Sequence, residues 1–428
     1  MIIFVFLFFE ILFGIALPKD NPSDVFSILC VFLNSIAVFI FISKSFKKEY
    51  RTILFIAYLL RLTLLFADYY KWFPILHSGA DSESLNWNAI NIMHYGFHGT
   101  FIYTNYGYLT GTIYSLIGPQ RLFLQYINVV FGMGTLYYIY RTFQILNISE
   151  KTTRLFVFIS CLMPQLIIFS GILLRESIII FSTAISVYYF INWIYNNNFI
   201  HFIISICFIL LATWLHSGMI GVLFGYLFAI ISYNRKSDKI VFFSFRSFIF
   251  SFIALFFIIL LVKTGVFTQY FNNVLEPNDN DMSNKLYQRV TGAADAGSQY
   301  LSWINVNSPT QLLLFSPLKM FYFLFSPIPF NWRGVSDIIG FCLDSVILLY
   351  LFYIIISGFK LVKNRIKKNT ILFLMIGFLV TTFIYGYGVS AAGTAMRHRT
   401  KLFPILIVAA AIVYDYIYNK NFKEKYVT

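Results

Sequence analysis

The segment Ala391–Tyr414, AAGTAMRHRTKLFPILIVAAAIVY, places a basic cluster directly before a long apolar run. Arg397, His398, Arg399 and Lys401 form the cluster. The run after it has the length that lets a helix cross a bilayer. Basic residues beside such helices usually face the cytoplasm. The side of the membrane on which this cluster lies therefore decides how the chain is threaded.

Apolar runs of this kind recur along almost the whole chain. Of the 428 residues, 59% are hydrophobic, 20% aromatic and only 12% charged, whereas soluble domains carry about 25% charged residues. The sequence therefore predicts an all-α, polytopic membrane protein that forms one integral membrane domain, residues 1–428. The net charge of +14 is attributed to cytoplasmic loops and not to nucleic-acid binding.

Twelve segments have the length and apolarity of membrane-spanning helices. They are expected near 2–17, 25–43, 52–68, 122–140, 155–171, 174–194, 199–214, 217–233, 241–262, 338–358, 370–389 and 402–418. The first contains Glu10 and lacks a basic start, so it is predicted to be an uncleaved helix and not a signal peptide.

The basic loops give the orientation. The segments 44–51, 233–239 and 359–368 and the C-terminal tail are rich in Lys and Arg, which predicts that they are cytoplasmic, together with both termini. With this alternation, the basic cluster that follows residue 389 faces outward, against the usual charge bias. Either it contacts lipid phosphates at the interface, or it binds a phosphate of the substrate.

Two further apolar stretches do not fit this alternation. If 101–118 or 310–330 crossed the membrane, strongly basic loops would fall on the outer side. Both are therefore expected to be interfacial or re-entrant. Two large periplasmic loops result, 69–121 and 263–337.

The first loop contains candidate acidic residues. Apolar residues recur at helical spacing there, at Leu85, Ala89, Met93 and Phe97, which predicts an amphipathic helix on the membrane surface. Asp81 and Glu83 precede this stripe. They are interpreted either as helix caps or as a general base or metal ligand.

Two other pairs of titratable residues are candidates for a site. Arg175 and Glu176 open the span 174–194, where charges are costly; they form either a self-neutralising pair or a site residue with its partner. His94 and His98 are four residues apart, but no third ligand at a diagnostic spacing joins them, so solvated histidines are favoured over a metal site.

Several motifs occur in an order that is similar to a known family. They are GADSES (79–84), MPQLIIFS (163–170), LLRES (173–177), YFLFSPIPFNW (322–332) and GTAMRHR (393–399). Together they resemble bacterial O-antigen and capsule repeat-unit polymerases (Wzy-like), within the wider GT-C membrane glycosyltransferases.

The resemblance implies an enzyme of the bacterial inner membrane. It would transfer glycan from an undecaprenyl-pyrophosphate-linked donor to a lipid-linked acceptor at the periplasmic face, with inversion. Its partners would be this oligosaccharide lipid and membrane lipid, with a chain-length regulator protein as a further candidate, and no cofactor is expected. The implied catalytic candidates are Asp81, Glu83, Glu176 and His398, and the implied pyrophosphate ligands are Arg175, Arg397 and Arg399.

Two other functions stay open from the sequence. A GT-C transferase that uses a polyprenyl-monophosphate sugar would add single sugars, with a divalent metal near Asp81. A lipid-oligosaccharide flippase would fit the twelve spans, and Arg61 and Asp344 inside spans favour it unless they pair with other buried groups. The large loops and the lack of paired repeats count against a flippase.

Overall fold

The computed structural model describes residues 2–15, 24–75, 78–96, 104–234, 237–241, 248, 252, 298–301, 303, 304 and 309–426. The described chain is helical, apart from one short two-stranded hairpin. It forms two compact units. Unit 1 comprises residues 1–188 and 210–217, and unit 2 comprises 189–209 and 218–428.

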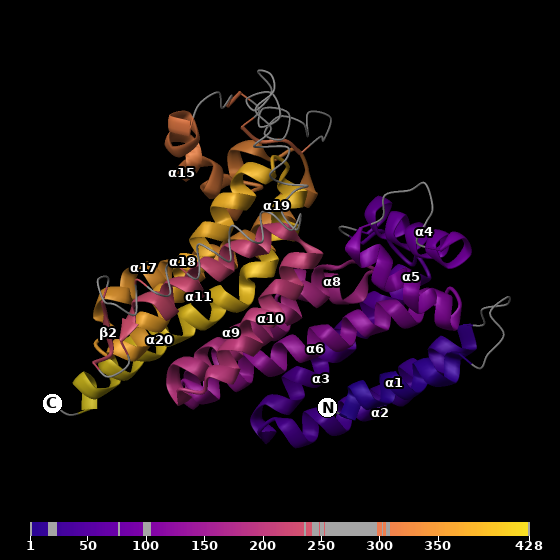
Figure 1. The fold of residues 1–428 in the computed structure, drawn as a ribbon, viewed down its shortest axis with the longest axis horizontal. Coiled ribbons are helices and arrows are strands. Elements are labelled where there is room, and N and C mark those ends of the chain that lie inside the picture. The colour runs from indigo at the N-terminus through magenta and orange to yellow at the C-terminus, as the bar shows by residue number, and fades with distance from the viewer. Residues whose placement is uncertain are drawn as a thin grey trace. The chain divides into compact units, whose positions relative to one another are not determined.

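Unit 1 is a bundle built around α6. Its helices are α1 (Ile2–Ile15), α2 (Asp24–Ser45), α3 (Lys48–Tyr69), α4 (Ala80–Tyr95), α5 (Asn105–Ile117), α6 (Arg121–Ile145), α7 (Glu150–Leu162), α8 (Pro164–Gly171), the first part of α9 (Glu176–Asn196) and the last part of α10 (Phe199–Leu215). The central helix packs against α2, α3, α7 and α8, and the core of the unit lies along it (Figure 1).

The two ends of unit 1 differ in character. At one end, Lys47 pairs with Glu150, and Arg154 pairs with Glu49 at 2.8 Å. These pairs bring the predicted cytoplasmic segments before α3 and at the start of α7 together. The helices α4 and α5 lie at the other end (Figure 1).

The predicted amphipathic helix in the loop 69–121 is present as α4. Its buried apolar residues include Leu85, Ala89 and Ile92, and the helix packs against α5. The approach is close, because a Cβ added at Gly111 would lie 2.6 Å from Ile92. The apolar stripe is therefore covered by a neighbouring helix.

The prediction that 155–171 forms one continuous helix is wrong. Here α7 and α8 are separate helices, bent by 46° at the break. Proline at 164 has no N–H to donate and clashes with the preceding turn, so the helix ends at Leu162 and restarts at Pro164. The break places Gly171 at the end of a short, steeply inclined helix.

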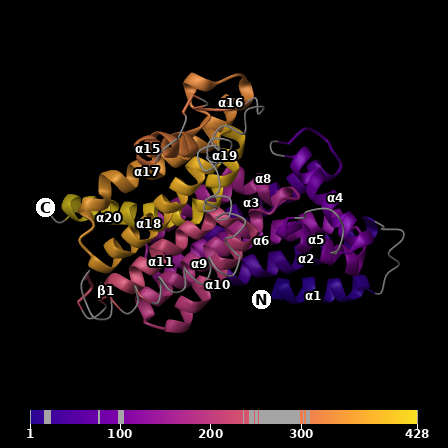
Figure 2. The ribbon, with the colours of Figure 1, turned by 45° about the horizontal axis from the view of Figure 1, so that its top comes forward.

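Unit 2 contains the remaining elements. They are the rest of α9 and α10, the 3₁₀ turn η1 (Ser217–Met219), α11 (Ile220–Ser232), β1 (Tyr233–Asn234), β2 (Lys239–Ile240), α15 (Pro309–Phe325), η2 (Pro329–Asn331), α16 (Val335–Gly340), the π-helix η3 (Phe341–Ser345), α17 (Val346–Gly358), η4 (Phe359–Leu361), α18 (Arg365–Gly388), α19 (Ala392–Arg399), η5 (Thr400–Leu402) and α20 (Phe403–Tyr426). Helix α11 packs along α18, and α17 packs along α20 (Figure 2).

Unit 2 also has a basic end and an opposite end. The hairpin β1–β2 lies beside the start of α18, where Asn369 Nδ2 donates to the carbonyl of Asp238 at 3.0 Å. The segments 233–239 and 359–368 thus share one end. Helix α19 follows the far end of α18, so the basic cluster lies opposite these loops within the unit (Figure 2).

Seven described helices are long and apolar enough to cross a membrane, and eight if the bent pair α7–α8 counts as one span. The seven are Asp24–Ser45, Lys48–Tyr69, Arg121–Ile145, Glu176–Asn196, Asp337–Leu361, Arg365–Gly388 and Ala392–Tyr418. Shorter apolar helices lie at Phe199–Leu215, Ser217–Ser232 and Leu313–Phe325. The expected span 241–262 and most of the loop 263–337 fall outside the described residues, so the count of twelve stays a prediction.

Candidate functional site: two polar clusters at helix ends

Polar side chains on one face of α6 form the centre of the first cluster. Arg121, Gln125 and Asn128 are spaced i, i+4 and i+7, so they lie on the same side of the helix. Asp68 at the end of α3 and Glu83 in the first turn of α4 join them. We call these five residues the α6 cluster.

Arg121 links two carboxylates from different helices. Its Nη1 donates to Oε1 and Oε2 of Glu83 at 2.8 and 2.9 Å. Its Nη2 donates to the hydroxyl of Ser82 at 3.2 Å and lies 3.7 Å from Oδ2 of Asp68. The Asp68 side chain is 3% exposed and that of Glu83 is 38% exposed. The cluster therefore runs from a buried carboxylate to one that solvent reaches.

Gln125 and Asn128 fix the irregular segment between α8 and α9. Gln125 Nε2 donates to Asp68 Oδ2 at 2.6 Å and to the Gly171 carbonyl at 3.3 Å. Asn128 Nδ2 donates to the carbonyls of Ile172 and Leu174 at 2.8 and 2.9 Å. Carbonyls left over where a helix ends need such partners. The predicted site residues that follow this segment are therefore tied to α6.

Glu176 begins α9, and Arg175 lies in the turn directly before it. Arg175 Nη1 donates to the carbonyl of Leu215 at 3.3 Å, and its side chain is half-buried. Glu176 is fully buried in the first turn. Arg175 thus bonds to a backbone carbonyl and not to Glu176. The two residues do not form the self-neutralising ion pair that was one of the two interpretations.

Two tyrosines of α5 border the cluster. Burial raises the pKa of Tyr106 above its usual range; a hydrogen bond with Asn128 opposes this effect, and the charge of Glu176 adds to it. Burial likewise raises the pKa of Tyr114, and the charge of Arg121 opposes it. Burial thus favours the protonated form of both phenols, and Tyr114 donates to Asn86 Oδ1 at 2.7 Å.

The first loop also carries Asp81 and His94, which are not members of the α6 cluster. Asp81 is exposed on α4, and the N-cap position belongs to Gly79, which makes no side-chain cap hydrogen bond. Gly79 has φ +110°, a conformation that favours glycine. Asp81 and Glu83 therefore lie in the first turn of the helix and not at its N-cap position. His94 is exposed, and His77 and His98 lie outside the described residues.

The second cluster, the α19 cluster, contains Arg397, His398, Arg399 and Lys401 of unit 2. Within it Arg399 is 2% exposed. Arg399 Nε donates to Asp344 Oδ2 at 2.7 Å, and Nη2 contacts the same oxygen and donates to Ser345 Oγ at 2.9 Å. Its Nη1 donates to the carbonyls of Leu324 and Ser326 at 2.7 and 2.6 Å. These bonds tie α19 to the π-helix η3 and to the end of α15.

Two other members of the α19 cluster, His398 and Lys401, lie beside the ring of Tyr385. Lys401 is fully buried, its Nζ lies 3.0 Å from Nδ1 of His398, and it sits 5.9 Å from the centre of the Tyr385 ring. His398 is buried beside the same ring. Arg397 alone among the four is half-buried. Of the two predicted phosphate ligands in this cluster, Arg397 is partly accessible and Arg399 is buried.

The two intramembrane charges that favoured a transporter have structural partners. Asp344 pairs with Arg399, as the alternative interpretation expected. Arg61 is fully buried in α3 and donates to the carbonyl of Ala57 at 2.9 Å and to Ser170 Oγ at 3.1 Å. It also reaches the carbonyl of Cys161 at 3.5 Å, beside the break between α7 and α8.

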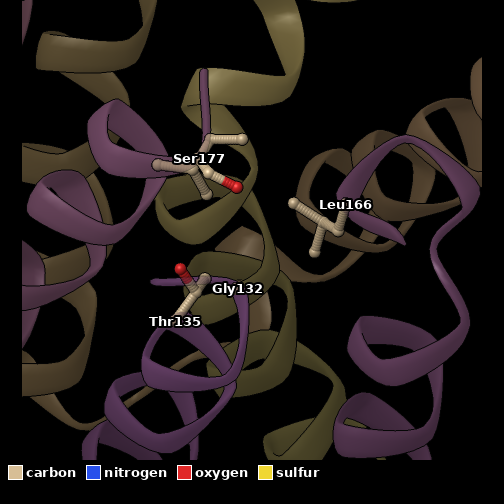
Figure 3. A pocket seen from close by; sticks show the side chains of 5 residues that line it. Gly132, Thr135, Leu166 and Ser177 are labelled. Atoms are coloured by element: carbon tan, nitrogen blue, oxygen red, sulfur yellow. The ribbon is translucent and has the colours of Figure 1, made fainter. Parts of the chain in front are cut away.

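A small void lies further along α6. Gly132, Thr135, Leu166, Ser177 and Ile180 line it, and the hydroxyls of Thr135 and Ser177 face the same space (Figure 3). Its volume of about 10 Å³ accommodates about one water molecule. It is therefore too small for a sugar or a phosphate.

Asp68, Arg121, Gln125 and Asn128 were missed as candidate site residues at the sequence level. Asp68 ends an apolar run, and the other three recur at helical spacing in RLFLQYIN. That spacing could have shown that the three residues share one face of a helix. The contact between Arg121 and Glu83 could not have been found in this way, because it depends on how α4 is placed beside the start of α6.

Comparisons of the chain with protein-family models, with curated proteins and with solved structures find no match. Among the described residues, no group of three His, Cys, Asp or Glu side chains is placed to hold a metal ion. Inferences about function therefore start from the geometry of the two clusters and from the sequence motifs.

Proposed function

We propose that the protein is a membrane glycosyltransferase that polymerises polysaccharide repeat units. It takes glycan from an undecaprenyl-pyrophosphate-linked donor and adds it to a lipid-linked acceptor at the outer face of the bacterial inner membrane. Under this proposal the chain has twelve spans, cytoplasmic termini and periplasmic loops at 69–121 and 263–337.

The observation that carries the proposal is the partly exposed Glu83–Arg121 pair at the end of unit 1 opposite the basic loops. A carboxylate that accepts a proton must be reachable and fixed in orientation. Glu83 is 38% exposed, and Arg121 holds both of its oxygens. If the basic loops are cytoplasmic, as the sequence predicts, this pair would lie at the outer face of the membrane, where a lipid-borne substrate would be met.

In the proposed reaction, a hydroxyl of the acceptor sugar attacks the anomeric carbon of the donor glycan. The new carbon–oxygen bond forms as the bond from that carbon to the pyrophosphate oxygen breaks. The hydroxyl proton passes to a carboxylate of the enzyme, and undecaprenyl pyrophosphate leaves with the bonding electron pair. A single displacement of this kind inverts the anomeric centre.

Arginine side chains would stabilise the departing pyrophosphate. Guanidinium groups bind phosphate oxygens bidentately and keep their charge, and each donor aimed at developing charge is worth about 3–4 kcal/mol. Arg175 and Arg397 are the half-buried candidates for this role. Arg399 would have to break its bonds to Asp344 and to two carbonyls before it could bind phosphate, so its proposed part is to hold α19.

The test is the surface-polysaccharide ladder of a deletion strain, restored with wild-type or variant protein. We expect long chains to disappear while the single repeat unit still reaches its final acceptor. Arg397→Ala should reproduce this result with normal amounts of protein. A normal ladder in the deletion strain would overturn the proposal. Loss of one side-branch sugar would indicate a monophosphate-dependent transferase, and accumulation of lipid-linked repeats on the inner leaflet would indicate a flippase.

A further inference from the structure

We infer that Arg121 is a positioning residue that orients Glu83 as the base that receives the acceptor proton. The inference rests on the proposed function and deepens it. It also assigns the α6 cluster to the acceptor and not to the donor pyrophosphate.

The three predicted carboxylates differ in access. Glu176 is fully buried, so a sugar hydroxyl does not reach it. Asp81 is exposed on the surface of α4. Glu83 is accessible over about a third of its side chain, and Arg121 Nη1 holds both of its oxygens. A catalytic group needs both access and a fixed orientation, and Glu83 has both.

Arg121 is itself fixed from three directions. It begins α6, it donates to Ser82 on the helix that carries Glu83, and it lies 3.7 Å from Asp68. Asp68 is in turn held by Gln125 and by the hydroxyl of Ser78. The orientation of Glu83 is thus set by a chain of contacts that ends in the buried core of unit 1.

The charge of the cluster favours an uncharged ligand. Asp68 and Glu83 carry two negative charges, and Arg121 carries one positive charge. A pyrophosphate placed here would be repelled by the excess carboxylate. A sugar hydroxyl carries no such penalty, so the acceptor is the better fit.

The experiment uses the full-length enzyme in lipid nanodiscs with purified undecaprenyl-pyrophosphate-linked repeat units. Glu83→Gln should lower kcat about 100-fold or more, the usual contribution of a general base, without changing KM for the donor. Arg121→Met should also lower kcat, and Arg121→Lys should restore part of it. The double variant should be no slower than Glu83→Gln, because residues that act as a unit are not additive.

Ser84→Ala is the matched control, since Ser84 is exposed on the same turn of α4; it should behave as wild type. Thermal unfolding of every variant reports whether the fold is retained. Full activity of Glu83→Gln, with activity lost in Asp81→Asn, would overturn the inference and leave the polymerase intact. Additive losses from Glu83→Gln and Arg121→Met would do the same. A wild-type enzyme that does not extend the lipid-linked repeats would instead overturn the proposed function.

Discussion

Two arginine–carboxylate pairs show how burial changes the role of the same chemistry. In unit 2 the side chains of Arg399 and Asp344 are each 1% exposed. In unit 1 Arg121 and Glu83 are 16% and 38% exposed. The buried pair joins α19 to η3 and α15, and its arginine is saturated with protein acceptors. The other pair remains open to solvent on one side.

This difference separates structural arginines from candidate functional ones. A buried pair cannot easily change partners, because each ion left alone in a low-dielectric interior is costly. A partly exposed pair makes a small net contribution to folding and can exchange one partner for a substrate. On this basis Arg399 stabilises the fold, whereas Glu83 and Arg121 are available for chemistry.

The largest expected effect is the loss of the buried pair. Arg399→Ala leaves the Asp344 carboxylate alone inside unit 2, which should reduce stability by about 3–5 kcal/mol. Fluorescence-detected size exclusion after heating would measure the change. The double variant Arg399→Met/Asp344→Leu should recover most of the loss, because it removes both charges. A heat-stable Arg399→Ala protein would contradict the structural role of Arg399.

A smaller effect is expected where a buried arginine has neutral partners. A Cβ at Gly132 would lie 2.6 Å from Ser170 Oγ and 3.1 Å from Arg61 Nε. Gly132→Ala should therefore cost about 1–3 kcal/mol, as overpacking of a tight core does. Combining it with Ser170→Gly makes room for the methyl group and should restore part of the thermal stability. Equal stability of Gly132→Ala and wild type would show that this contact is looser than the structure indicates.

The partly exposed pair should matter little for folding. Glu83→Gln is expected to change stability by about 0–1 kcal/mol, so the protein should express and unfold like wild type even where transfer is abolished. The same heating assay would measure it beside Arg399→Ala. A loss as large as that of the buried pair would erase the contrast between the two clusters.

The smallest effect is expected at the surface pair Lys47–Glu150, whose side chains are 56% and 62% exposed. The hydrogen bond and charge of Lys47 lower the pKa of Glu150. Any stabilisation is therefore present above the ordinary pKa of that carboxyl and is lost as the pH falls through the lowered value. Lys47→Ala should lower the Tm only slightly at pH 7, and the difference from wild type should disappear as the pH falls through the lowered pKa. A loss at pH 7 as large as that of the buried pair, or one that persists at low pH, would refute this.

Particular residues show how far sequence reasoning reached. The span predicted at 174–194 from its apolar run is the helix α9 (Glu176–Asn196), and the helix predicted in the first loop from apolar spacing is α4 (Ala80–Tyr95). The break before Pro164 lies inside a span predicted to be continuous, because a hydropathy run does not register the missing N–H of one proline. The sequence could not show which of Arg397 and Arg399 is buried. Residues two positions apart in a helix lie on different faces, and which face packs against the rest of the unit is decided by the tertiary structure.

The sequence by itself determined that this is a helical membrane protein, because its runs of apolar residues are long enough to form spans and its basic residues gather in short loops. Only the tertiary structure decided which polar residues form sites. Asp68, Glu83 and Arg121 come from three helices, and the distances between them depend on how those helices pack. Hydropathy is a property of each segment alone, whereas the partner of a charged group is set by neighbours that are distant in the chain.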